Sequence, residues 1–162
     1  MKNIFILLIA VVINASIAFC TQSEIFVPSG LEVPVKFKES YSTQNITIET
    51  KIPIMIANDV YYKNTLIFPK GSSGYMYPTY VKKAKVAAGS FGKIKFESAY
   101  IKDVNGNEQL IIVNKEFKPP KYSFGEIAFS WDFMSKDRKN VVLSEGQLII
   151  GKTVNEFPVN IK

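Results

Sequence analysis

The stretch IKFESAYIKDVNGNEQLIIV, residues 94–113, contains two alternating runs separated by Asn105-Gly106. In each run apolar side chains recur at nearly every second position, which is typical of a β-strand with one buried face and one wet face. A type I′ turn needs positive φ at both central residues, and Asn-Gly adopts that conformation at low cost. The stretch therefore predicts a β-hairpin with a two-residue turn.

Counting outward from this turn predicts the register of the hairpin. The expected partners are Val104 with Asn107, Ile101 with Leu110, Tyr100 with Ile111 and Ser98 with Val113. One face of the hairpin would then hold Ile94, Phe96, Tyr100, Ile111 and Val113. A slip of one residue would move such a set to opposite faces, so the register can be tested.

Similar patterns run through most of the chain after residue 20. Strands are expected at 31–37, 45–49, 52–56, 60–68, 75–81, 127–133, 141–143, 147–150 and 154–161. Pro34 has no amide donor, which predicts an edge position or a bulge for the first of these strands. Turn signals recur about every ten residues and no long amphipathic helix is seen, which is the spacing of a sandwich or barrel. The sequence predicts an all-β fold, a single antiparallel β-barrel or β-sandwich domain over residues 19–162.

The N-terminal segment has the layout of a secretory signal peptide. Lys2 precedes an apolar stretch at 4–13 and a small, polar stretch at 14–18. The apolar stretch is too short for a transmembrane helix. We expect cleavage after Ala18, or as late as Cys20, and export of the chain to the periplasm or the cell exterior. A lipid anchor on Cys20 is an alternative, but the bulky Phe19 before it argues against lipidation.

The composition excludes several kinds of catalytic site. The 162 residues include no His and one Cys, so a Ser-His-Asp triad, a His-containing zinc site and an internal disulfide are ruled out. We expect no cofactor and no metal. The chain has 20 Lys+Arg against 14 Asp+Glu, and the excess favours anionic partners. Export argues against nucleic acid as the partner.

Tyrosines and lysines in the middle of the chain form the candidate binding surface. Its residues are Tyr75, Tyr77, Tyr80, Lys82, Lys83 and Lys85. Aromatic rings beside cations could hold a glycan or an anionic polymer. The same lysines could instead form a solvated edge that discourages aggregation between strands. The expected partners are an anionic envelope polymer, a lipid surface or an envelope protein.

Five acidic residues are the candidates for a carboxylate pair of the kind that hydrolyses glycosides. They are Glu97, Asp103, Glu108, Glu126 and Asp132. Each occupies a polar position of an alternating strand or a turn, which indicates a solvated residue. The sequence therefore favours a protein that is not an enzyme.

Turn residues carry a resemblance to known proteins. The motifs are Val27-Pro28-Ser29-Gly30, Ala57-Asn58-Asp59-Val60, Phe68-Pro69-Lys70-Gly71 and Asn105-Gly106. Together they resemble a family of uncharacterised exported bacterial β-domains. More distantly they are similar to the β-barrel domain of the outer-ring subunit of type IV secretion channels. The resemblance covers about residues 25–113 and implies an envelope-associated β-barrel, and it brings no catalytic residue.

Three functions remain open at this point. The first is a non-catalytic exported β-domain that serves as a structural or binding module of the bacterial cell envelope. The second is a carboxylate-dependent enzyme on cell-wall or extracellular glycan, which predicts two acids about 5–10 Å apart in a concave site. The third is a subunit of a secretion apparatus, which predicts an exposed apolar edge that contacts copies of itself.

Overall fold

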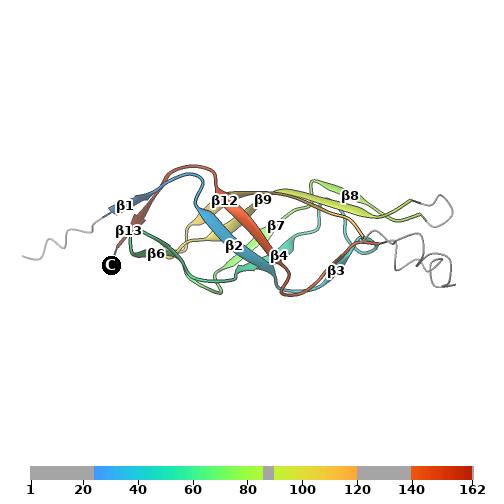
Figure 1. Ribbon diagram of the computed structural model, residues 1–162, viewed down its shortest axis with the longest axis horizontal. Helices are drawn as coiled ribbons and strands as arrows, with labels where there is room; N and C mark the ends of the chain where they lie inside the picture. The colour runs from blue at the N-terminus through green and yellow to red at the C-terminus, as the bar shows by residue number, and fades with distance from the viewer. Residues whose placement is uncertain (1–23, 86–89, 120–139, 162) are drawn as a thin grey trace, which may run out of the picture.

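The computed structural model describes residues 24–85, 90–119 and 140–161, and these ranges contain β-strands and no helix (Figure 1). The strands are β1 (Glu24–Val27), β2 (Glu32–Phe37), β3 (Tyr41–Ser42), β4 (Ile52–Ile56), β5 (Val60–Tyr62), β6 (Thr65–Phe68), β7 (Ser73–Met76), β8 (Tyr80–Lys82), β9 (Lys93–Lys102), β10 (Glu108–Phe117), β11 (Val142–Leu143), β12 (Leu148–Thr153) and β13 (Phe157–Asn160). The expected all-β fold is confirmed. The expected signal peptide, the strand expected at 127–133 and the acids Glu126 and Asp132 lie outside the described residues.

Six of the strands form a closed antiparallel barrel. β2, β4, β7, β9, β10 and β12 each pair with the next, and β12 pairs back with β2. Their order around the barrel is their order along the chain, so this is an up-and-down barrel and not a sandwich. Closure gives every barrel strand two neighbours.

Shorter pairs extend the barrel at both ends (Figure 1). β1 pairs with β13 at one end of the elongated molecule, and β3 pairs with β11 toward the other. β8 pairs with the first residues of β9, next to that second end, and β5 forms a hairpin with β6. In the described ranges, no helix has the length and apolar character needed to cross a bilayer.

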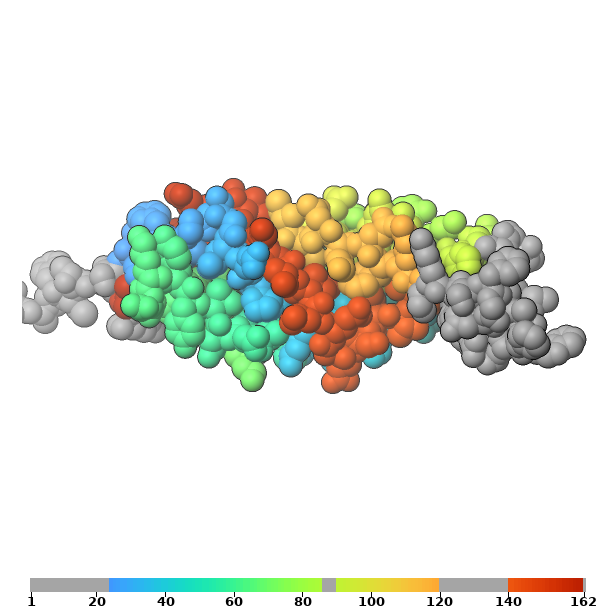
Figure 2. All heavy atoms as spheres, in the orientation of Figure 1, coloured from blue at the N-terminus to red at the C-terminus, as the bar shows by residue number. Residues whose placement is uncertain are grey.

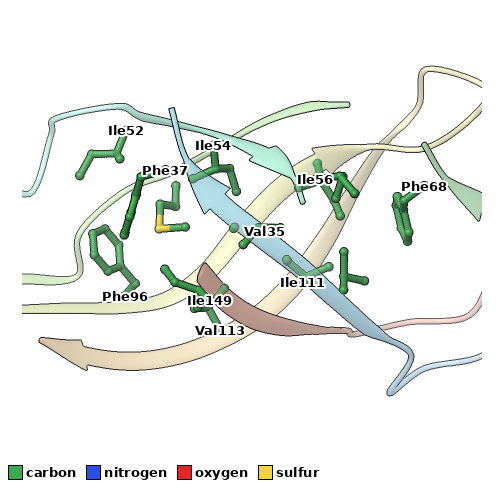
Figure 3. Close-up of a cluster of buried hydrophobic side chains, with 14 of the residues drawn as sticks. Val35, Phe37, Ile52, Ile54, Ile56, Phe68, Phe96, Ile111, Val113 and Ile149 are labelled. Carbon is green, nitrogen blue, oxygen red and sulfur yellow. The ribbon is translucent and has the colours of Figure 1, made fainter. Parts of the chain in front are cut away.

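The barrel interior is packed with apolar side chains (Figure 3). The labelled residues Val35, Phe37, Ile52, Ile54, Ile56, Phe68, Phe96, Ile111, Val113 and Ile149 are all buried. Phe37, Phe96 and Phe117 pack ring against ring, with centroids 6.0 to 6.1 Å apart. Such tilted aromatic contacts stabilise the core beyond the area that they bury.

Two glycines allow the barrel wall to close tightly. At Gly151 on β12 a Cβ atom would lie 2.5 Å from Cδ1 of Ile111, the end of a flexible side chain. At Gly74 on β7 a Cβ atom would collide with the backbone carbonyl oxygen of Tyr100 and with the side chain of Ile101. Neighbouring strands approach closely here because these positions carry no side chain.

Pro34 is not at a sheet edge, contrary to the expectation from its missing amide. It lies in β2 between β12 and β4, opposite Ile150. The Ala57 amide donates to the Pro34 carbonyl at 2.9 Å, just beyond Val35 and Ile56, the last pair of the β2–β4 ladder. Because N and C=O of one strand residue face the same neighbour, the missing donor removes only the reciprocal bond to the Ala57 carbonyl, at the end of that ladder.

The β9–β10 hairpin exists, but its turn and register differ from the prediction. The observed pairs include Lys102 with Glu108, Ile101 with Gln109, Tyr100 with Leu110 and Ser98 with Ile112, so each predicted partner was one residue out. Only Gly106 of the turn has positive φ, at 85°, and the Gly106 amide donates to the Asp103 carbonyl at 3.0 Å. This is a three-residue loop, a type I turn followed by a left-handed glycine.

The shared face of the hairpin was predicted correctly except for Tyr100. Ile94, Phe96, Ile111 and Val113 are buried, whereas Tyr100 is 38% exposed on the outside of the barrel. A bulge between Ile112 and Lys115, with Asn114 at φ 42°, shifts the register by one residue in mid-strand. Across this bulge the buried positions of β9 change from even to odd numbers, from Ile94 and Phe96 to Ala99 and Ile101.

Three more strand predictions were wrong in detail. Residues 45–49 form turns instead of a strand, with Ile46 buried and Ile48 exposed. The run at 60–68 is a hairpin, β5 and β6, whose central residues Lys63 and Asn64 both have positive φ. The run at 75–81 is divided between β7 and β8.

Candidate ligand-binding groove

A row of outward-facing side chains crosses four barrel strands. Pro53 on β4 lies opposite Tyr75 on β7, Tyr75 lies opposite Tyr100 on β9, and Tyr100 lies opposite Leu110 on β10. Each of these residues is next to at least one buried residue on its own strand, so the period of two directs it outward. The row puts two aromatic rings at the centre of an outer wall.

The row borders a groove of about 460 Å³, which we call the tyrosine groove. It is lined by Lys51, Pro53, Ser73, Gly74, Tyr75, Tyr100, Ile101, Lys102 and Glu108. The floor is aromatic and apolar, and charged groups of both signs surround it. Concave sites with few polar groups around an apolar floor are typical of ligand sites.

The tyrosine rings hold one another in place. Tyr75 and Tyr100 stack with centroids 5.2 Å apart and an interplanar angle of 23°. Tyr77 meets Tyr75 edge to face at 5.8 Å, and Nζ of Lys51 lies 3.9 Å from the centroid of the Tyr75 ring. Offset stacking and a cation over an aromatic ring are both attractive, so the rings are ordered before a ligand arrives.

Tyr75 is also fixed through its hydroxyl group. Its O–H donates to Oε2 of Glu108 at 3.2 Å. Partial burial, followed by the charge of Glu108, raises the pKa of Tyr75 above its ordinary value of 10.0. The phenol therefore stays a neutral donor at physiological pH, and the carboxylate of Glu108 keeps further lone pairs for a ligand.

The arrangement suits binding by stacking better than it suits a reaction. Two rigid rings offer an amphipathic surface, while Lys51, Lys102, Ser73 and Glu108 offer donors and acceptors at its border. Among the residues that the structure describes, no three His, Cys, Asp or Glu side chains gather as in a metal site.

The six residues of the candidate binding surface predicted from the sequence lie in two separate places. Tyr75 lines the tyrosine groove and Tyr77 contacts the Tyr75 ring edge to face, whereas Tyr80 lies on β8 opposite Lys95. Tyr75 pairs with Tyr100, five residues further along β9 than Lys95, which separates the two levels by roughly 16 Å. Lys82, Lys83 and Lys85 lie on the β8 side and are exposed.

Sequence reasoning missed Tyr100, Lys51 and Glu108 as members of the groove. The predicted register had turned Tyr100 toward the core, which hid its stacking with Tyr75. With a three-residue turn, the same alternation would have placed Tyr100 on the outer face.

A second charged cluster surrounds Glu116 on β10. Its carboxylate lies 2.6 Å from Nζ of Lys118, 3.0 Å from that of Lys93 and 3.4 Å from that of Lys95. The hydrogen bonds from Lys118 and Lys93 lower the pKa of Glu116 to about 2. One carboxylate therefore forms ion pairs with three ammonium groups, and the cluster has a net positive charge.

The three described acids of the enzyme hypothesis lie in different surroundings. Glu108 borders the tyrosine groove, and Glu97 borders another recess together with Asn114 and Glu116. Asp103 is 4% exposed, and its carboxylate accepts hydrogen bonds within the β9–β10 turn. Their placement gives the carboxylate-pair mechanism no support.

No protein-family model matches the sequence, and no curated protein matches it.

Proposed function

We propose that the chain is an exported, non-catalytic binding module of the bacterial cell envelope, and that its tyrosine groove binds a glycan. The observation that carries the proposal is the stacked pair Tyr75–Tyr100 in an open groove bordered by hydrogen-bonding groups. The N-terminal leader pattern supports the location. The different surroundings of the candidate acids Glu97, Asp103 and Glu108 support a binding role over catalysis.

The chemistry of a glycan matches the groove. A sugar ring has an apolar face of C–H groups and a rim of hydroxyl groups, so it can stack on a tyrosine and exchange hydrogen bonds at its edge. Tyr100 is the ring to test first, because it is 38% exposed and contacts Tyr75 on one side. Lys51 and Glu108 line the groove and provide a charged donor and a charged acceptor.

The experiment is co-sedimentation of residues 19–162 with purified peptidoglycan sacculi. We expect Tyr100→Ala to weaken retention by about fivefold or more, the usual cost of removing an aromatic anchor. The matched control is Tyr61→Ala, since Tyr61 is 57% exposed on β5 and does not line the groove. Equal retention of the Tyr100 and Tyr61 variants, with both unchanged in thermal unfolding, would contradict the proposal.

A second candidate function, a subunit of a larger envelope assembly, is favoured by a different surface. Ile112, Leu148 and Ile150 are 43%, 53% and 54% exposed on β10 and β12. Figure 2 shows β10 and β12 side by side with β2 on one face of the molecule. We call these three residues the apolar strip, and exposed apolar residues that adjoin one another often mark contacts with other proteins.

Self-association separates this candidate from the first. If the strip joins copies of the chain, light scattering will give a mass above that of the monomer, and Ile150→Lys will return the monomer mass. A monomer at all concentrations up to about 0.1 mM would remove self-assembly through the strip from consideration, because a useful interface binds more tightly than that.

A further inference from the structure

The hairpin made by β8 and the first residues of β9 extends beyond the barrel. It lies at the end of the molecule opposite β1 and β13 (Figure 1). Tyr80 pairs with Lys95 and Lys82 with Lys93, and further out Lys85 and Ser90 exchange backbone hydrogen bonds of 3.0 and 3.1 Å. The described residues on its two sides, 80–85 and 90–95, therefore pair as an extension that carries their side chains away from the tyrosine groove.

The hairpin is strongly basic. It carries Lys82, Lys83, Lys85, Lys93 and Lys95, and we call it the lysine hairpin. The sequence contains no Asp or Glu between Asp59 and Glu97, so the hairpin has no acid of its own. Glu116 on β10 forms ion pairs with Lys93 and Lys95. Lys82, Lys83 and Lys85 are exposed to solvent.

An apolar ring accompanies these charges. Phe91 follows Ser90 near the outer part of the hairpin and is 44% exposed. Tyr80, also 44% exposed, stands at the base with Nζ of Lys93 5.9 Å from its ring centroid. A soluble polyanion would use the lysines alone, whereas a lipid surface uses both, since headgroups attract lysines and the interfacial layer accepts aromatic rings.

We propose that the lysine hairpin docks the protein on an anionic lipid surface. Lys82, Lys83 and Lys85 contact the phosphate headgroups, and Phe91 enters the interfacial layer. The hairpin lies at one end of an elongated domain, so it can reach a membrane without burying the tyrosine groove. This proposal is independent of glycan binding, and either one can fail without the other.

The experiment measures co-sedimentation of residues 19–162 with vesicles of phosphatidylcholine containing about one-third phosphatidylglycerol. One lysine near an anionic surface changes binding by about fivefold, so the triple change of Lys82, Lys83 and Lys85 to Gln should weaken binding about 100-fold. The control with the same change in net charge replaces Lys63, Lys70 and Lys152 with Gln, and should weaken binding by less than about fivefold. Phe91→Ser should weaken binding with no change in charge.

Ionic strength and the Tyr100→Ala variant give further readouts of vesicle binding. Raising the ionic strength from about 0.1 M to about 1 M shortens the screening length from about 10 Å to about 3 Å, so binding should be lost. Tyr100→Ala should leave vesicle binding unchanged, which separates this surface from the tyrosine groove.

Three results would overturn the proposal. The first is equal binding to vesicles of pure phosphatidylcholine, and the second is equal weakening by the two triple variants. The third is vesicle binding of the Phe91→Ser variant equal to that of the parent, together with tight binding of the protein to soluble polyphosphate. That result would identify a polyanion as the partner instead of a membrane.

Discussion

Substitution of Asp103 tests whether its hydrogen bonds stabilise the turn between β9 and β10. Asp103 is 4% exposed at the end of β9. Its Oδ1 accepts hydrogen bonds from the amides of Asn105 and Asn107, both at 2.9 Å, and its Oδ2 accepts one from Nε2 of Gln109 at 2.8 Å. The carboxylate thereby holds the three-residue turn that sets the register of the longest hairpin.

The cost of Asp103→Ala can be worked from these three bonds. Each backbone amide loses a charged acceptor worth about 1.5 kcal/mol, while the Gln109 side chain can rotate to water and costs little. The expected loss is therefore about 3 kcal/mol in the free energy of unfolding. Asp103→Asn keeps an oxygen for the two amides and should cost about 1 kcal/mol, because the remaining bonds are neutral.

Urea unfolding followed by circular dichroism measures both values. For a domain of this size the alanine variant should also melt roughly 6–12 °C lower than the parent. An alanine variant within about 0.5 kcal/mol of the parent would refute the reasoning. So would an asparagine variant as unstable as the alanine variant, since the retained oxygen would then contribute nothing.

Three further predictions concern the barrel and its charges. Gly74→Ala should destabilise by about 3 kcal/mol and Gly151→Ala by about 1 kcal/mol in urea unfolding. A Cβ at Gly74 would collide with a backbone oxygen, whereas at Gly151 the nearest atom is the flexible end of a side chain and the backbone oxygen of Ile112 lies 3.3 Å away. Phe96→Ala should cost about 3–5 kcal/mol by the same assay, since it removes a buried ring that packs against two others. The Glu116 carboxyl should titrate near pH 2 by carboxyl NMR. Because its pKa falls from 4.5 on folding, the stabilisation of the folded state by Glu116 is present above pH 4.5 and is lost as the pH drops toward 2. Glu116→Gln should therefore flatten the pH dependence of the free energy of unfolding between pH 4.5 and 2.

Alternation of side chains was enough to find the strands that build the barrel. The strands β2, β4 and β12 fall within one or a few residues of the runs expected at 31–37, 52–56 and 147–150. In β2 and β4 the buried residues are the alternating apolar positions of those runs, whereas in β12 Ile149 is buried and its apolar neighbours Leu148 and Ile150 face outward. The choice between barrel and sandwich could not be made this way, since it depends on β12 meeting β2 across more than a hundred residues.

The errors arose where a turn or a side chain decides the register. A left-handed two-residue turn was expected at Asn105-Gly106, yet the structure has two consecutive positive φ angles at Lys63 and Asn64. The Asp103 carboxylate favours the wider turn by binding two of its amides, and no dipeptide rule contains that contact. The misplaced register then hid Tyr100, and with it the groove.

The pairing of β1 with β13 gives the domain two distinct poles. Glu24 lies opposite Asn160, so the two ends of the described chain are neighbours at one pole, within about 5 Å between Cα atoms. The lysine hairpin lies at the other pole (Figure 1). A linker or fusion partner attached next to Glu24 or next to Asn160 would thus be attached at the same pole, with the lysine hairpin at the far end of the domain. A short link between these two ends should also permit circular permutation.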